Sequence, residues 1–322
     1  MCRNGGRVLE ILGKYGTVNM TKKKNITVKL MLLLASVLWG LSFVLLKDVL
    51  ETVPMMFLLA FRFSLAAVIL SVIFFKKFRL FNKKYLIHGL ISAIVLFVAY
   101  MFQTPGLTMT TPGNNAFLTS VYCVVVPFFF WIVSKKRPDR FNLIAAIVCL
   151  AGIGFVSLTD GFNVNLGDML TLVCGVLFAV HIVSIAVFGK DKDPILYIVI
   201  QFAIVSVLMW ISSFIFESGQ PKFSAMDLNA VLVMLYLAVA CSCIGFTFQT
   251  IGQKYVEPSS ASLILSLEAV FGVLFSIAMG YEELTLLKAI GFSLIFVAVV
   301  ISETKLSFLK RKTLRGAEQP DE

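Results

Sequence analysis

Long apolar runs dominate this chain and limit what it can fold into. Ten of them approach the roughly 20 residues that a helix needs to cross a bilayer. Because hydrocarbon offers no water to the backbone, each run must satisfy its own hydrogen bonds and is predicted to be a helix. The sequence therefore predicts an all-α integral membrane protein with ten transmembrane helices. They span residues 28–47, 54–75, 85–104, 110–133, 141–158, 166–188, 194–216, 229–252, 258–279 and 285–303.

Composition excludes other classes of protein. The chain is 59% hydrophobic and 14% charged, which is too apolar for a soluble domain. Its net charge of +10 does not indicate a nucleic-acid partner, because the cations form short clusters between apolar runs. Cysteines inside apolar runs are typical of small buried hydrophobes, so no disulfide, metal or cofactor is expected. These cysteines are Cys123, Cys149, Cys174, Cys241 and Cys243.

The cations lie in alternate loops. Basic clusters precede the first predicted helix and follow the second, fourth, sixth and tenth, whereas the other loops carry mainly Asp and Glu. By the positive-inside rule, both termini of this multi-pass protein face the cytoplasm, and the cell membrane is its expected location. The N-terminal segment, 1–27, and the basic tail, 304–322, are therefore predicted to be cytoplasmic. Translation from Met20 would make residues 1–19 a start-site extension.

One stretch of sequence occurs twice. Residues 100–121 read YMFQTPGLTMTTPGNNAFLTSV, and residues 246–267 read FTFQTIGQKYVEPSSASLILSL. The matches are mostly polar residues, Gly or Pro, whereas a chance overlay of two apolar helices would match Leu and Val. A membrane chain that repeats itself is typical of a transporter. Aligned without a gap, the copies share Phe102/Phe248, Gln103/Gln249, Thr104/Thr250, Gly106/Gly252, Pro112/Pro258 and Ser120/Ser266.

The two copies lie on predicted helices 3–4 and 8–9. Their offset of five helices is odd, so the second copy crosses the membrane in the opposite direction. The chain is therefore predicted to form two inverted five-helix repeats, 28–158 and 166–303, with a site at their interface. The helices that precede the duplicated stretch in each half align weakly, at an offset seven residues shorter than that of the stretch itself. In that alignment Arg62-Phe63 matches Gln201-Phe202, and Ser42 matches His181.

Several short motifs make the sequence resemble the drug/metabolite transporter superfamily, specifically its ten-helix EamA-like family. They are Leu38-Trp39-Gly40-Leu41-Ser42-Phe43, Phe61-Arg62-Phe63, the two Phe-Gln-Thr units with a later Pro and Ser, and Leu267-Glu268. Their order over residues 28–303 carries the likeness, although Ala269 stands where the family has Pro. The resemblance implies two five-helix halves around a cavity lined by helices 1–4 and 6–9.

Three ionisable residues lie inside predicted spans. Glu268 is about 15 Å into its helix, and is either a protonatable or substrate-binding group or a structural carboxyl bonded to neighbouring helices. Arg62 is a candidate to bind a substrate carboxylate or to pair with Glu268; the alternative is a structural residue that extends toward the outer interface. His181 is a candidate proton relay, or a structural histidine bonded to a carbonyl.

Other candidates come from the repeat and from aromatic residues. Gln103 and Gln249 are expected near the two mouths of a cavity, or as helix caps, and Gly106 and Gly252 are expected to end their helices. Pro127 is a candidate hinge, or a static kink. The candidate aromatic walls, which are alternatively packing residues, are Trp39, Tyr100, Tyr122 and Phe248.

These observations predict a secondary active transporter that moves small polar or amphipathic metabolites, such as amino acids or related compounds, by alternating access. Its partners are then a small-molecule substrate and the lipid bilayer. The direction, import or export, and the coupling ion, for which protons are a candidate, stay open. The chain has no Walker A motif and is not expected to be an enzyme. The alternatives are an intramembrane enzyme such as a lipid-linked transferase, or a non-transporting membrane subunit.

Overall fold

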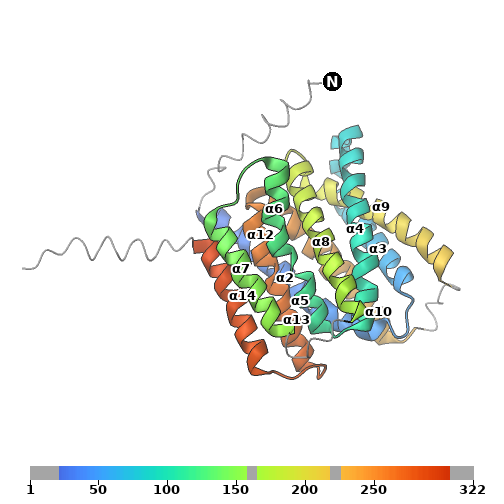
Figure 1. The fold of residues 1–322 in the computed structure, drawn as a ribbon. Helices are drawn as coiled ribbons and strands as arrows, with labels where there is room; N and C mark the ends of the chain where they lie inside the picture. Colours follow the sequence, from blue (N-terminus) through green and yellow to red (C-terminus); the bar gives the residue numbers. More distant parts are fainter. Residues whose placement is uncertain (1–21, 158–164, 218–225, 305–322) are drawn as a thin grey trace, which may run out of the picture.

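The computed structural model describes residues 22–157, 165–217 and 226–304, and this part of the chain is helical apart from short connections (Figure 1). Eight of the described helices are long and apolar enough to cross a membrane. Two shorter apolar helices, Arg140–Gly152 and Leu286–Ser302, bring the total to the predicted ten. The all-α membrane class is confirmed. The predicted extension 1–19 and the tail beyond residue 304 lie outside the described residues.

The first half of the chain supplies five helical spans. They are α2 (Lys22–Val49), α3 (Met55–Ile73), α4 (Lys83–Met109), the consecutive α5 (Pro112–Thr119) and α6 (Tyr122–Ser134), and α7 (Arg140–Ser157). A short 3-10 helix, η1 (Phe75–Leu80), connects α3 to α4.

The second half repeats this arrangement. Its spans are α8 (Leu166–Phe188), α9 (Pro194–Phe216), the consecutive α10 (Leu228–Tyr236), η4 (Leu237–Phe246) and α11 (Thr247–Tyr255), the consecutive α12 (Pro258–Leu265) and α13 (Leu267–Ala278), and α14 (Leu286–Thr304). Both halves therefore interrupt their fourth span, between α5 and α6 and between α12 and α13. In the second half, η4 is a π-helical segment in the middle of a long span.

Local sequence explains where the helices start. Pro112, Pro194 and Pro258 stand in the first turns of α5, α9 and α12, where a missing N–H costs little. At the start of α8, Asn165 and Asp168 form a reciprocal capping box. These short-range signals fix the helix boundaries without help from the rest of the fold.

Charged side chains satisfy the ends of neighbouring helices. Glu217, which follows α9, accepts a 2.6 Å hydrogen bond from the backbone N–H of Met56 at the start of α3. Lys47, in the last turn of α2, donates at 2.9 and 3.0 Å to the carbonyls of Leu107 and Thr110 at the end of α4. Exposed backbone groups at a helix end otherwise need water or a cap, so these contacts tie helix ends together across the bundle.

The two halves pack as an inverted pair. Equivalent helices meet directly, α3 along α9 and α7 along α14. Contacts between non-equivalent helices occur in matched pairs. The contact of α4 with α8 corresponds to that of α2 with η4 and α11. The contact of α2 with α13 corresponds to that of α8 with α5 and α6. Two inverted repeats related by a pseudo-two-fold axis in the membrane plane produce this pattern.

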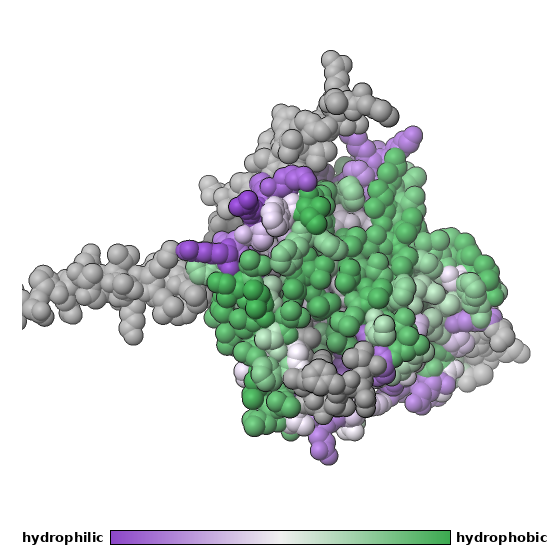
Figure 2. Space-filling view, in the orientation of Figure 1, coloured by the Kyte–Doolittle hydropathy of each residue, from purple (hydrophilic) through white to green (hydrophobic). Residues whose placement is uncertain are grey.

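The flanks of the bundle are apolar. Figure 2 shows hydrophobic residues covering the sides of the molecule, with hydrophilic residues gathered toward its two ends. Large side chains point outward there, including Phe214, Phe296 and Ile147, which are 68%, 60% and 61% exposed. An apolar surface of this kind is suited to contact with the lipid tails of a bilayer.

Gly106 and Gly252 do not end their helices, contrary to the prediction. Gly106 lies inside α4, and Gly252 lies inside α11. A Cβ on Gly106 would lie 2.6 Å from Thr171 Oγ1 of α8, and a Cβ on Gly252 would lie 2.4 Å from Leu32 Cδ2 of α2. Thr171 and Leu32 are equivalent in the alignment of the first helices of each half. The shared glycine therefore permits the same close helix contact in both halves.

Gly106→Ala is expected to destabilise the protein, because its Cβ would also lie 3.0 Å from the backbone oxygen of Gly167, which cannot rotate away. Overpacking of this kind costs about 1–3 kcal/mol. Gly154→Ala is the matched control, since no atom lies within 4 Å of its Cβ position. Thermal unfolding of both variants in detergent should lower the melting temperature of Gly106→Ala alone. Equal melting temperatures would contradict a close contact at Gly106.

Candidate functional site

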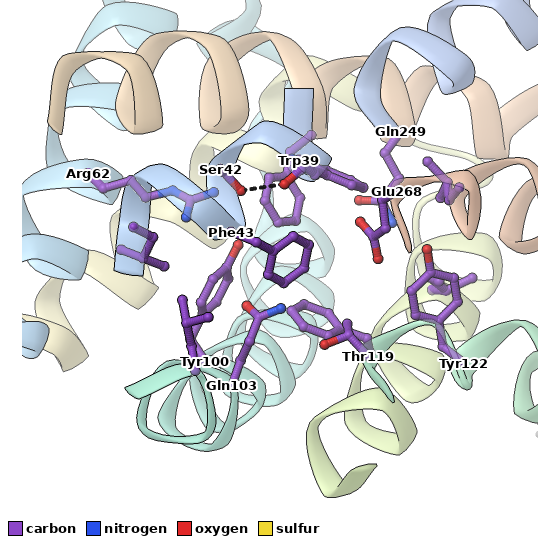
Figure 3. A pocket seen from close by; sticks show the side chains of 16 residues that line it. Trp39, Ser42, Phe43, Arg62, Tyr100, Gln103, Thr119, Tyr122, Gln249 and Glu268 are labelled. Atoms are coloured by element: carbon purple, nitrogen blue, oxygen red, sulfur yellow. Dashed lines mark hydrogen bonds between the residues drawn. The ribbon is translucent and has the colours of Figure 1, made fainter. Parts of the chain in front are cut away.

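A cavity lies between the two halves (Figure 3). Its empty space, open solvent included, is about 590 Å³. The family resemblance implies a cavity lined by spans 1–4 and 6–9. Each of these spans contributes a lining residue except α9. The lining residues, most of them buried, are Trp39, Ser42, Phe43, Leu46, Arg62, Tyr100, Gln103, Leu107, Thr119, Tyr122, Phe178, Ile182, Phe246, Gln249, Leu265 and Glu268.

Most of the cavity wall consists of equivalent residues from the two repeats. The ungapped alignment of the duplicated stretch pairs four lining residues of α4–α6 with four of η4–α13, and the shorter spacing pairs two of α2 with two of α8. The inverted repeat therefore builds the cavity itself and not only the scaffold around it. The pairs are Tyr100/Phe246, Gln103/Gln249, Thr119/Leu265, Tyr122/Glu268, Trp39/Phe178 and Phe43/Ile182.

Aromatic contacts around the cavity also occur twice. Tyr100 meets the ring of Phe178 edge-on at 5.6 Å between centroids, and its equivalent Phe246 meets Trp39 at 5.0 Å. Phe63 contacts Tyr100 at 5.2 Å, as Phe202 contacts Phe246 at 5.6 Å. Such ring pairs stabilise beyond their buried area, so both halves brace the wall in the same way.

The π-helical segment η4 gives the wall polar backbone contacts. In this segment the carbonyl of Cys241 accepts a 3.1 Å hydrogen bond from the indole N–H of Trp39. Ser242, the next residue, donates to the Leu237 carbonyl five positions earlier at 3.0 Å. π-Helical turns of this kind are frequent at functional sites.

Arg62 faces the cavity from α3. Its side chain is 3% exposed, its Nε donates to Ser242 Oγ at 2.7 Å, and its Cζ lies 5.4 and 5.2 Å from the ring centroids of Phe63 and Tyr100. Figure 3 shows the guanidinium directed into the cavity, on the side opposite Glu268. Among the described residues, no carboxylate forms an ion pair with Arg62. The predicted Arg62–Glu268 pair does not form, and the guanidinium keeps donors for a ligand.

Glu268 lies on the opposite side of the cavity from Arg62 (Figure 3). It is 4% exposed and stands in the first turn of α13, where a helix N-terminus favours negative charge. No cation pairs with it in the part of the chain that the structure describes. The Tyr122 hydroxyl points into the same end of the cavity. It has no hydrogen-bond partner among the described residues.

Glu268 and Tyr122 owe their positions to the two interrupted spans. Each begins a half-helix that follows a break, at Ser266 before α13 and at Ser120 before α6. Ser120 Oγ bonds the Ala116 carbonyl at 3.0 Å and lies 3.5 Å from the carbonyl oxygen of Ser266. Serine side chains that bond back to the preceding turn bend helices. The breaks thus meet at the pseudo-two-fold axis and present two equivalent side chains to the cavity.

Gln103 and Gln249 both line the cavity, and their expected positions near its two mouths stay a prediction. Both are buried, at 8% and 3% exposure. Gln249 Oε1 has no hydrogen-bond partner among the described residues. Gln103 lies inside α4, and Gln249 lies in the first turn of α11, which follows η4 directly.

Three sequence candidates lie away from the cavity lining. His181 is buried behind the wall, where its Nε2 is 3.0 Å from Gln201 Oε1. Phe248 packs at the edge of a core cluster, and Pro127 lies inside α6, which continues through it without interruption. The break at Ser120 lies seven residues, or about two helical turns, before that proline.

The sequence predictions missed part of the wall. Phe178 and Phe246 are the counterparts of Trp39 and Tyr100, so extending the repeat alignment to aromatic residues would have found them. Thr119 precedes the shared serine of the repeat and was detectable in the same way. The other missed lining residues are Ser42, Phe43, Leu46, Leu107, Ile182 and Leu265.

The site combines a guanidinium on one side with a carboxyl and a phenol on the other, between aromatic walls and two amides. Buried charges without partners are costly in an apolar medium, so each is best satisfied by a ligand of opposite charge. A small molecule that carries both a carboxylate and an ammonium group has complementary chemistry at both ends.

Known proteins are similar to this chain in sequence and in fold. An uncharacterized transporter from Archaeoglobus fulgidus is 30% identical over 286 residues, which cover 86% of this chain and 86% of that protein. A probable amino-acid metabolite efflux pump from Escherichia coli is 26% identical over 298 residues, covering 86% of this chain and 95% of the relative. A solved crystal structure with 17% sequence identity has the same fold, at a TM-score of 0.70, over 88% of this chain and 98% of its own.

The match to a family extends over both halves. The EamA-like transporter family covers residues 27–158 and again 165–304, which leaves only the ends of the chain and a short connection unmatched. Together with the cavity between inverted halves and the relative from Archaeoglobus fulgidus, this match shows that the chain belongs to the EamA-like transporter family of the drug/metabolite transporter superfamily.

Proposed function

We propose that the protein is a secondary active transporter of small zwitterionic metabolites, amino acids or related compounds, which it exports across the cytoplasmic membrane by alternating access. The observation that carries this proposal is the cavity with Arg62 and Glu268 on opposite sides, neither held in an ion pair among the described residues. The similarity to a probable amino-acid metabolite efflux pump supports both the substrate class and the direction.

Each end of the substrate has a defined partner in this proposal. The carboxylate binds the Arg62 guanidinium, which Ser242 and Tyr100 hold in place. The ammonium binds Glu268 beside the Tyr122 hydroxyl, and Gln103 and Gln249 bond the atoms between. Charge-assisted hydrogen bonds at both ends orient the substrate, while the aromatic walls accept an apolar side chain.

The orientation in the membrane follows from the loops. Lys76, Lys77 and Arg79 lie between α3 and α4, and Lys135 and Lys136 between α6 and α7. Under the positive-inside rule these loops face the cytoplasm, together with both ends of the chain. The units that move against each other are the two repeats, 28–158 and 166–303, and protons are the coupling ion, with Glu268 as the group that binds them.

Arg62→Gln is expected to weaken binding of the substrate carboxylate. A hydrogen bond to a charged group contributes about 1.5–3 kcal/mol, so half-saturation should require about 10- to 100-fold more amino acid in proteoliposome transport. The amino acid methyl ester, which lacks the carboxylate, provides the matched control, and its transport should not change between wild type and variant. A variant that handles the free amino acid as the wild type does would remove Arg62 from the binding site.

Glu268→Gln should separate coupling from movement of substrate. Glutamine keeps the shape of the side chain and its hydrogen bonds but cannot release a proton. Proton-driven accumulation should stop, while counterflow should continue at a higher substrate concentration, since exchange requires only that the cavity alternates and the amide oxygen still accepts from the ammonium. Glu283→Gln, on an exposed loop, is the control and should retain both activities. Persistent proton-driven accumulation in Glu268→Gln would refute the coupling role.

A further inference from the structure

The cavity is symmetric except at one end. Four lining residues have no lining counterpart in the other repeat: Ser42, Leu46, Arg62 and Leu107. Their counterparts in the alignment are His181, Ile185, Gln201 and Gln253, in the same order. None of these four counterparts is among the residues that line the cavity.

The unmatched lining residues share one side of the membrane. Leu46 stands near the Val49 end of α2, Leu107 near the Met109 end of α4, and Arg62 in the half of α3 that begins at Met55. In this structure the cavity therefore extends from the pseudo-two-fold axis toward that side.

Their counterparts share the opposite side. Ile185 stands near the Phe188 end of α8, Gln253 near the Tyr255 end of α11, and Gln201 in the half of α9 that begins at Pro194. The region that would mirror the extended end of the cavity is closed in this structure.

The closed region contains polar atoms without partners. Gln253 is 5% exposed, and neither its Nε2 nor its Oε1 has a hydrogen-bond partner among the described residues. His181 is 1% exposed and its Nδ1 lacks a partner there as well, although its Nε2 is 3.0 Å from Gln201 Oε1. Burying an amide without partners is unfavourable, and apolar residues would pack this region better. The closed state alone does not explain why these side chains are polar.

We propose that His181, Gln201 and Gln253 form a second substrate subsite, which lines the cavity when it extends to the opposite side. This inference rests on the proposed alternating access. In inverted repeats, the alternative state arises when each half takes the conformation that the other half has now. The exchange closes the region around Arg62 and opens its counterpart, which brings the unpartnered atoms of Gln253 and His181 to the substrate.

The second subsite takes the same carboxylate by different chemistry. Arg62 offers a fixed positive charge, whereas Gln201 and Gln253 offer neutral amide donors, and His181, whose Nε2 donates to Gln201 Oε1, orients the Gln201 amide. Neutral hydrogen bonds are weaker than charge-assisted ones. The two states therefore hold the substrate with unequal strength, tighter on the side of Arg62.

Cysteine accessibility tests this subsite directly. Gln253→Cys and its counterpart Leu107→Cys are placed singly in the full-length protein, and sealed vesicles of both orientations are treated with a membrane-impermeant methanethiosulfonate. The native cysteines of the described residues are buried, so the wild type gives the background. Leu59→Cys, buried at 0% exposure away from the cavity, is the control that should stay unlabelled.

The two cysteines should react from opposite faces of the membrane. Addition of a saturating L-amino acid should change their labelling rates in opposite directions, by at least about 5-fold, because each rate follows the population of one state. Ile185→Cys and Leu46→Cys form a second counterpart pair, should Gln253→Cys fail to insert. Labelling of both members of a pair from one face, or no labelling at Gln253→Cys and Ile185→Cys while Leu107→Cys reacts, would overturn the proposal.

Transport of a labelled amino acid is measured on the same vesicles. Reciprocal labelling with no amino-acid transport by the wild type would reject the proposed substrate class and still support a second subsite. Amino-acid transport without labelling at Gln253→Cys and Ile185→Cys would support the proposed function and reject the subsite.

Discussion

The meeting of two equivalent helix breaks, at Ser120 and Ser266, is the constraint on which the rest of the structure depends. Because the second repeat is inverted, equivalent positions approach each other only near the pseudo-two-fold axis, and Ser120 Oγ lies 3.5 Å from the carbonyl oxygen of Ser266. The half-helices that leave this point carry Tyr122 and Glu268 into the cavity. Moving either break by one residue would rotate these side chains by about 100° and remove them from the site.

Polar chemistry inside the bundle is concentrated around this axis. Hydrocarbon penalises unpaired charge, so Arg62 and Glu268 are tolerated only because they face a cavity rather than lipid. The aromatic contacts of Tyr100 and Phe246 brace the wall on both sides of the axis. The wall lies between Arg62 and Glu268, which the proposed zwitterionic substrate would bridge.

The sequence determined the class and the repeat but not the details of the site. Apolar run length predicts a span, because a helix must cross a fixed thickness of hydrocarbon, and the shared Gln, Gly, Pro and Ser residues revealed the inversion. The breaks at Ser120 and Ser266 were not predictable in this way, since they depend on single side-chain hydrogen bonds to the preceding turn. A hydropathy profile does not report such hydrogen bonds.

Tertiary contacts account for the remaining differences from prediction. Gly106 was expected to end a helix because glycine often does, yet its role is set by the approach of α8, which only the packed structure shows. Gln103 and Gln249 were expected near the two mouths of one cavity from their repeat positions, and both line the cavity. His181 was a candidate proton relay because imidazole titrates near physiological pH, but in this structure Phe246 stands beside it and its Nε2 lies 3.0 Å from Gln201 Oε1.

Inversion of the two halves is tested most directly by the sidedness of equivalent loops. Lys136, between α6 and α7, and Glu283, between α13 and α14, are exposed and nearly equivalent in the repeat alignment. Single cysteines at these two positions are treated in intact cells with a membrane-impermeant thiol reagent. Inverted repeats predict that Glu283→Cys labels from outside and that Lys136→Cys labels only after the membrane is opened. Labelling of both cysteines from the same side would contradict the inversion and, with it, the pairing of residues that builds the cavity.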